Sequence, residues 1–174
     1  MLRPAPACQA CFPLTALVFN SPTTTSTMQI TTTLITETTN GTEEITQTFQ
    51  GTLQQQGALT LLTYDDPELG ATRIFITEDR VRIVRKGTFT TQMVFLPNAT
   101  THSPYHTPGG TFDLGIHTTL LHHNLTPISG TLTAHYTLFL NGEAAAQNEL
   151  TVKWAENGLT GLIGFQATTG NNKP

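Results

Sequence analysis

The stretch that decides the fold is Thr131–Leu140, TLTAHYTLFL, which is followed at once by Asn141-Gly142. Apolar or aromatic side chains stand at every second position and alternate with threonine and histidine, up to Phe139. This period of two is the pattern of a half-buried β-strand. Asn-Gly is the strongest two-residue signal for a β-hairpin. The stretch therefore predicts a strand that turns directly into its antiparallel neighbour.

Segments with the same character lie on both sides of this strand. They are Ile30–Thr38, Ile45–Leu53, Ala58–Tyr64, Thr72–Ile76, Arg80–Lys86, Phe89–Phe95, Thr111–His122 and Leu150–Trp154. Asn40-Gly41 predicts a second hairpin, and Pro97–Pro104 reads as a longer loop. The only helical pattern, Glu143–Gln147, is too short to form a stable helix. We therefore expect an all-β domain, a closed antiparallel up-and-down β-barrel of about eight to ten strands, with a two-sheet sandwich as the alternative.

The composition agrees with this fold class. The chain has 174 residues, 37% of them hydrophobic and only 11% charged, and threonine is by far the commonest residue. Threonine is a β-branched strand former, whereas a helical protein would use Glu and Lys at polar positions. The formal net charge is −4, and most of the eight Lys and Arg lie between Arg73 and Lys86 beside several acids. This distribution argues against a nucleic-acid-binding protein, which needs an extended basic surface.

The two ends of the chain differ from the strand pattern. Residues 1–27 contain a short apolar stretch broken by Pro13, and we interpret them as a disordered or mis-annotated leader, with Met28 as the natural start; a weak signal peptide is the alternative. Residues 28–156 form the barrel domain, and the glycine-rich residues 157–174 a flexible tail. No apolar run is long enough to span a membrane. The only cysteines are Cys8 and Cys11, so the body of the chain suits a reducing cytoplasm.

Several motifs resemble a known family. Tyr64-Asp65-Asp66, Val81–Gly87, Tyr105–Thr111 and Leu138–Glu143 occur in the order and at spacings similar to those of the YwiB-like family. This is a bacterial domain of unknown function, found mostly in Firmicutes, with a calycin or lipocalin-like β-barrel. The resemblance covers about Met28 to Ala155 and implies the fold more than a function. Gly109 stands where the family has an aromatic residue, so any pocket shaped by that aromatic is altered here.

Arg85 is the sharpest candidate for a functional residue. In the strand Arg80–Lys86, Val81, Ile83 and Arg85 share the apolar face, which should point inward. A guanidinium there needs a counter-charge or hydrogen bonds. We expect it either to bind an anionic group at the barrel mouth or to pair with a carboxylate or strand-end carbonyls. A register shift of one residue would put Arg82 and Lys86 in its place.

Other residues complete the candidate ligand-binding set. Tyr105 and Thr107 reach the mouth if the Pro108-Gly109-Gly110 turn folds over it, Asp113 is a potential partner of Arg85, and Tyr64 lies in the first family motif. The six histidines show no ligand spacing, with His102 and His106 placed in the loop, so we expect no metal and no cofactor. No nucleophile motif or convergent catalytic pair is found.

We therefore expect a non-catalytic binding module for a small amphipathic or anionic ligand, with no nucleic-acid or membrane partner. The first alternative is a protein–protein interaction scaffold with a filled barrel. The second is an enzyme that uses Asp113, His117 or Tyr105 as an acid–base group. The expected core includes Ile45, Phe49, Leu61, Ile74, Ile76, Ile83, Met93, Phe95, Leu132, Tyr136, Leu138, Val152 and Trp154.

Overall fold

The computed structural model describes residues 26–38 and 43–157, which form ten antiparallel strands and, within these ranges, no helix. The strands are β1 (Ser26–Thr38), β2 (Glu43–Gln56), β3 (Leu59–Asp66), β4 (Gly70–Ile76), β5 (Val81–Lys86), β6 (Thr91–Phe95), β7 (Ala99–Thr107), β8 (Gly110–Leu125), β9 (Ser129–Leu140) and β10 (Glu143–Glu156). They belong to one sheet in the order β6-β5-β4-β3-β2-β1-β10-β9-β8-β7. The all-β prediction is confirmed, and the single continuous sheet is not a two-sheet sandwich.

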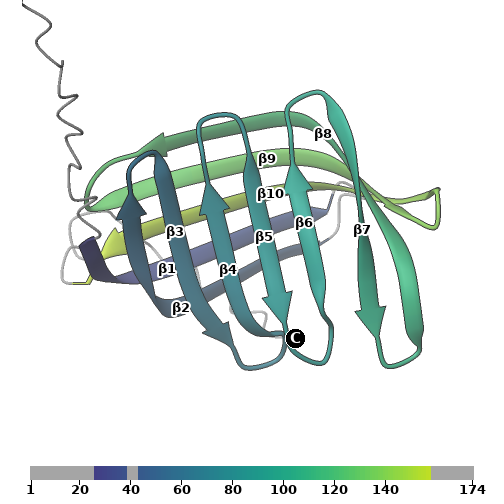
Figure 1. Cartoon of the computed structure of the whole chain (residues 1–174), viewed down its shortest axis with the longest axis horizontal. Helices are drawn as coiled ribbons and strands as arrows, with labels where there is room; N and C mark the ends of the chain where they lie inside the picture. Colours follow the sequence, from purple (N-terminus) through teal and green to yellow (C-terminus); the bar gives the residue numbers. More distant parts are fainter. Residues whose placement is uncertain (1–25, 39–42, 158–174) are drawn as a thin grey trace, which may run out of the picture.

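The sheet curls over so that its two halves face each other. In Figure 1, β3 to β6 cross in front of β8, β9 and β10. The inward side chains of the two halves meet, as the edge-to-face contact of Phe95 on β6 with Tyr136 on β9 shows, with ring centroids 5.1 Å apart. Burying apolar surface between the halves supplies the main driving force for this curvature. The fully buried side chains include Ile30, Leu53, Leu62, Ile74, Ile76, Val81, Phe95, Ile116, Leu132 and Val152.

The two edge strands, β6 and β7, lie side by side but do not form a ladder. They share one backbone bridge, Thr90 with His106. Further along, the Thr101 hydroxyl donates to the Val94 carbonyl at 2.5 Å, and the Ser103 hydroxyl donates to the Gln92 carbonyl. We call this contact the β6–β7 seam. A barrel closed by backbone pairing is therefore not confirmed.

Pro104 explains why the ladder stops at the seam. The backbone groups of His106 face β6, since they exchange hydrogen bonds with Thr90. In a strand, alternate residues direct their backbone groups to the same side, so those of Pro104 face β6 as well. Proline has no N–H to donate and is tolerated on an edge strand. The predicted Pro97–Pro104 loop is thus wrong: β7 begins at Ala99, and His102 and His106 are strand residues.

Two predicted core residues are also wrong. Ile45 is 46% exposed. Leu61 lies on the outer side of β3, because the buried members of that strand are Thr60, Leu62, Tyr64 and Asp66. The apolar run around Leu61 places similar residues on both faces, so its period does not identify the inner one. The other expected residues are either buried or, for Phe49, Met93 and Leu138, partly buried against the core.

The hairpin at Asn141-Gly142 is confirmed, with φ angles of 51° and 86° that suit the left-handed region a two-residue hairpin needs. The second predicted hairpin, Asn40-Gly41, lies outside the described residues. So do Cys8 and Cys11, nearly all of the predicted leader, and the tail beyond Asn157. No helix in the described ranges has the length and hydropathy of a membrane span.

Partly buried apolar residues lie at both ends of the curled sheet. In an antiparallel meander, the odd-numbered strands all finish at one end, which we call the Arg85 end because β5 finishes there. Phe49, Met93, Tyr105, Leu138 and Leu140 lie toward this end and are only partly buried. Towards the opposite end, Ile76, Val81, Phe95, Leu132 and Trp154 are at most 2% exposed. Met28, Leu121 and Leu125 are also only partly buried, although they lie toward this opposite end.

Candidate ligand-binding site at the Arg85 end

The register of β5 places Arg85 on the inner face. Arg85 pairs with Thr72 on β4 and Thr91 on β6, and both of these threonines are buried. Arg82 points the other way, and its guanidinium lies over the Phe75 ring, 4.2 Å from the centroid. The predicted face of the strand is thus correct. Arg85 itself is half-buried, because it is the last inward-facing residue of β5.

Two tyrosines from opposite halves of the sheet lie close to Arg85. Tyr64 on β3 is 3% exposed and Tyr136 on β9 is 8% exposed. Burial raises the pKa of both phenols above the ordinary value of 10.0, since desolvation penalises the phenolate. The positive charge of Arg85 acts in the opposite direction on both, and hydrogen bonds with Thr72 and Arg85 also lower the pKa of Tyr64, whereas the negative charge of Asp66 raises it. Both phenols are consequently neutral at physiological pH and can donate or accept a hydrogen bond.

Several inward polar atoms have no partner within the described part of the chain, two of them at the site. At the site they are Arg85 Nε and Thr91 Oγ1 on the neighbouring strand, and further away they are Thr118 Oγ1 and Trp154 Nε1; all four are shielded from solvent. Thr118 on β8 is 0% exposed and Thr91 is 8% exposed. Leaving a buried donor without an acceptor costs about 1–3 kcal/mol, so each of these atoms calls for a partner such as a ligand or ordered water. No carboxylate among the described residues forms an ion pair with Arg85.

Apolar and aromatic side chains surround this polar group. Phe49 stacks on Tyr64 with ring centroids 4.8 Å apart, and Phe89 stacks on Tyr105 at 6.3 Å. Met93, Leu138 and Leu140 pack against the core from the same end. The buried Asp66 carboxylate on β3 lies at the same end, and its Oδ1 accepts hydrogen bonds from the Glu68 and Leu69 N–H groups. The site thus combines a cation without an ion pair and neutral hydroxyls with partly exposed apolar walls. Such a combination suits a molecule with a small anionic group and an apolar body.

The other predicted site residues have different positions. Tyr105 is half-buried on the inner side of β7 and contributes to the apolar wall through its contact with Phe89. Thr107 stabilises the turn after β7, since its hydroxyl donates to the Gly110 carbonyl and accepts from the Gly109 N–H. Its hydroxyl is therefore used within the chain and is not directed at a ligand.

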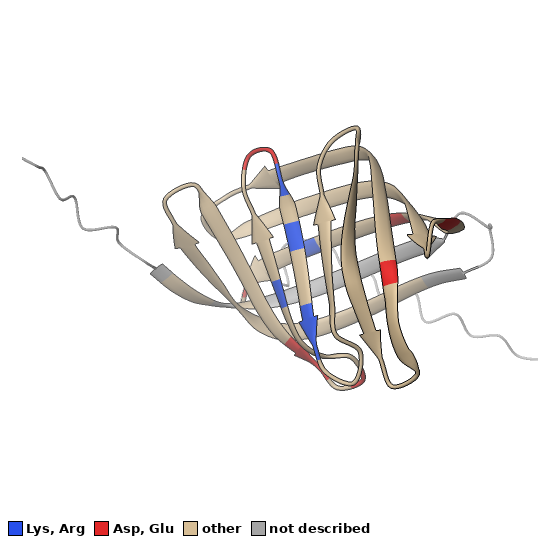
Figure 2. Ribbon diagram, turned by 45° about the vertical axis from the view of Figure 1, so that its right-hand side comes forward, with Lys and Arg blue, Asp and Glu red and all other residues tan. Residues whose placement is uncertain are grey.

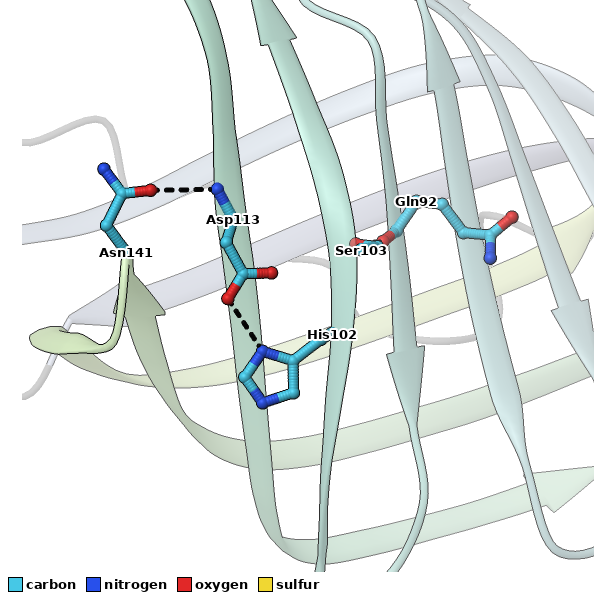
Figure 3. A network of polar contacts seen from close by, with 5 residues as sticks. All are labelled: Gln92, His102, Ser103, Asp113 and Asn141. Atoms are coloured by element: carbon cyan, nitrogen blue, oxygen red, sulfur yellow. Dashed lines mark hydrogen bonds and ion pairs between the residues drawn. The ribbon is translucent and has the colours of Figure 1, made fainter.

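Asp113 is not a partner of Arg85. Figure 3 shows it on the outer face of β8, where its carboxylate meets His102 Nδ1 at 2.9 Å. The side chains are 57% exposed for His102 and 49% for Asp113. The Asn141 side chain accepts a hydrogen bond from the Asp113 N–H at 3.0 Å and so fixes the strand at this point. The pattern of Thr111–His122 mixes polar and apolar residues on both faces, which left this orientation undecided.

The histidines form separate contacts: His123 Nε2 lies 3.1 Å from the Thr77 carbonyl of the opposite half of the sheet, and three others make contacts on the outer face. His106 bonds Thr111, His117 bonds Thr100, and His135 lies 3.3 Å from Glu149. No group of three or more histidine, cysteine, aspartate or glutamate side chains in the described ranges is placed to hold a metal ion.

Residues that complete the site were missed in the sequence because threonine occupies both faces of the strands. Thr72, Thr91 and Thr118 are inward, whereas Thr63 and Thr137, for example, lie on outer rows. The strand register could have identified two of them, because Thr72 and Thr91 are the cross-strand neighbours of Arg85. Tyr136 was predicted in the core but not as a neighbour of Arg85, since the curl of the sheet brings β9 opposite β5.

Comparisons with known proteins agree with this architecture. The family model described as Domain of unknown function (DUF1934) matches residues 28–152. The chain belongs to this family. Among solved structures it is similar to that titled "Crystal structure of ywiB protein from Bacillus subtilis", with a TM-score of 0.64 and 18% identity over 76% of this chain and 92% of the other. No curated protein matches the chain. The resemblance to the YwiB-like family is thereby confirmed, and the structural likeness supports the fold alone.

Proposed function

We propose that this DUF1934 domain is a non-catalytic binding module that holds a small amphipathic or anionic ligand at the Arg85 end. The observation that carries the proposal is the pair of shielded, unpartnered polar atoms Arg85 Nε and Thr91 Oγ1 on neighbouring strands, beside a guanidinium that forms no ion pair among the described residues. A bound anion would accept hydrogen bonds from these groups and balance the charge. The partly buried apolar side chains around them would cover the rest of the ligand.

The chemistry of the site supports binding over catalysis. An acid–base catalyst needs a group that exchanges a proton near neutral pH. The phenols of Tyr64 and Tyr136 have raised pKa values and stay protonated. The former enzyme candidates Asp113 and His117 bond His102 and Thr100 on the outer face, away from Arg85. The proposal includes a calycin-like barrel, in which the β6–β7 seam completes the wall, and a reducing cytoplasmic setting.

The direct test is native mass spectrometry of the protein purified from its own host. We expect a small molecule to accompany the wild-type chain and to be lost from Arg85→Ala. Arg82→Ala is the matched control, since it removes a guanidinium from the opposite face of the same strand, and it should keep the molecule. The proposal fails if the wild-type protein carries nothing, or if both variants retain the same molecule.

A further inference from the structure

A second surface of the molecule carries apolar and positively charged side chains side by side, unlike the polar outer face that a sheet usually presents to solvent. It is the outer side of β3 to β6, which we call the cationic face. One cross-strand row contains Leu61, Phe75, Arg82 and Val94, and the next contains Thr63, Arg73, Val84 and Gln92. Outer faces of antiparallel sheets are normally polar, whereas these rows mix half-exposed apolar side chains with guanidinium groups.

The positive charges on this face are not paired with acids. Arg73, Arg80, Arg82 and Lys86 form no ion pair with any carboxylate in the residues that the structure describes. Figure 2 shows the Lys and Arg positions grouped along β4 and β5, although the chain as a whole has a formal net charge of −4. The face is therefore complementary to an acidic partner and repels other cationic surfaces.

The apolar part of the face is open to a partner as well. No described element covers it, and Leu59, Phe75 and Val94 line a depression of about 450 Å³ together with Thr77, Arg80, Arg82 and Gln92. Apolar side chains that lie in a depression rimmed by charges are typical of an interaction site. The depression gives apolar side chains of a partner a place beside the cations.

Acidic turns limit the length of the cationic face. Asp65 and Glu68 lie at the turn between β3 and β4, and Glu78 and Asp79 lie at the turn between β4 and β5. Figure 2 shows these acidic positions at the two ends of the grouped cations. The seven residues of β4 span about 23 Å at about 3.3 Å per residue. A long polyanion would meet like charges at both ends, whereas a short acidic segment fits between them.

The aromatic residue on this face further favours a peptide. Binding of single-stranded nucleic acid relies on free aromatic rings on which bases stack. Phe75 is the aromatic residue in the depression, and the Arg82 guanidinium already covers one side of its ring. The planar guanidinium is held in place by this contact, and its N–H groups suit bidentate bonding to a carboxylate.

We propose that the cationic face docks a short, acidic, extended segment of a protein partner that carries carboxylates and apolar side chains together. The surface is separate from the Arg85 end, because Arg82 and Arg85 point to opposite sides of β5. Carboxylates bind Arg73, Arg80, Arg82 and Lys86, and the partner's apolar side chains enter the depression. Ligand binding inside the sheet and docking outside it can therefore occur independently.

The test uses a fluorescein-labelled heptapeptide of glutamates with leucine at its third and phenylalanine at its fifth position. In an extended peptide these two side chains share a face with the terminal glutamates. Fluorescence anisotropy with the full chain should show salt-sensitive binding, and NMR shift changes should map to β4 and β5. Arg73→Glu and Arg82→Glu should each weaken binding by about tenfold, the effect of about 1.4 kcal/mol.

Lys153→Glu is the matched control, since it makes the same charge change on β10, and it should alter affinity by less than about twofold. On the peptide side, replacing every glutamate with glutamine keeps the length and the apolar residues but removes the carboxylates, and this peptide should fail to bind. The proposal is overturned if the acidic peptide does not bind, or if Lys153→Glu weakens peptide binding as much as Arg82→Glu does. It is also overturned if a labelled twelve-nucleotide oligothymidylate binds this face more tightly than the acidic peptide.

Discussion

At the scale of single residues, Arg85 lowers the free energy of unfolding of the ligand-free protein. Its guanidinium lies half-buried beside Tyr64 and Tyr136, and its Nε has no acceptor among the residues that are described. A cation held in this way is destabilising unless something balances it. Proteins often retain such residues where binding requires them, at the expense of stability.

Arg85→Met should therefore stabilise the ligand-free protein, by about 1 kcal/mol, because an apolar chain of similar length replaces an unpaired charge. The same change should abolish retention of an anionic ligand. Urea unfolding of the ligand-free wild-type and variant proteins measures the first effect. Arg82→Met on the outer face loses the contact with Phe75 and should not stabilise the protein. A loss of several kcal/mol for Arg85→Met would instead reveal a fixed internal partner.

The two buried tyrosines predict a loss of stability in alkali. Their pKa values are raised in the folded protein, so the unfolded chain releases the phenolic protons first as pH rises above 10.0. The unfolded state then binds fewer protons than the folded state, and the free energy of unfolding decreases with pH. Each tyrosine contributes a slope of at most about 1.4 kcal/mol per pH unit. Urea unfolding between about pH 9 and 11.5 should show this decline, with a smaller slope for Tyr64→Phe.

At the scale of secondary-structure elements, the β6–β7 seam replaces backbone pairing with side-chain bonds. The Thr101 and Ser103 hydroxyls satisfy carbonyls of Val94 and Gln92 where Pro104 interrupts the ladder. Figure 3 shows Ser103 beside Gln92 across this seam. Beyond the backbone bridge of Thr90 with His106, two hydroxyl groups hold the wall of the curled sheet along this line.

Thr101→Val and Ser103→Ala should each lower the free energy of unfolding by about 1 kcal/mol, since each leaves a carbonyl without its donor. Amide hydrogen exchange in β6 should become faster in both variants. Thr100→Val is the control, because the Thr100 hydroxyl bonds the exposed His117 ring and lies off the seam. Equal exchange rates in β6 for all three variants would show that the hydroxyl bonds do not hold the seam.

The sequence predicted elements well wherever polar and apolar residues alternate. Thr131–Leu140 and Arg80–Lys86 revealed both their strands and the inward face of Arg85. The pattern was uninformative at Leu61, whose neighbours are apolar on both faces, and at Asp113, in a mixed segment. Pro104 suggested a loop because an edge strand tolerates proline, and edges cannot be identified before the strand order is known. The meeting of Arg85 with Tyr136 depends on the curl of the whole sheet.

At the scale of the whole molecule, the described core is confined to one continuous part of the chain. Its buried hydrophobic residues run from Ile30 to Ala155, and the family model matches residues 28–152. The packing seen in the described residues is therefore supplied within this part of the sequence.

We predict that a chain shortened to Met28–Glu156 folds on its own. Its free energy of urea unfolding should equal that of the full chain within about 0.5 kcal/mol, since the described core is complete in it. An insoluble product, or a deficit above about 1 kcal/mol, would show that residues beyond these limits contribute to the fold.

The β1–β10 ladder has a consequence for folding speed. It runs from the pair Ile30 and Glu156 to the pair Thr38 and Asn148, whereas every other ladder joins consecutive strands. Its partners are more than a hundred positions apart, so closing it costs the most chain entropy and raises the contact order. A circular permutant cut at Pro97-Asn98, with Glu156 linked to Ser26, would turn this ladder into a local hairpin. Such a permutant should reach the same sheet faster than the natural chain order does.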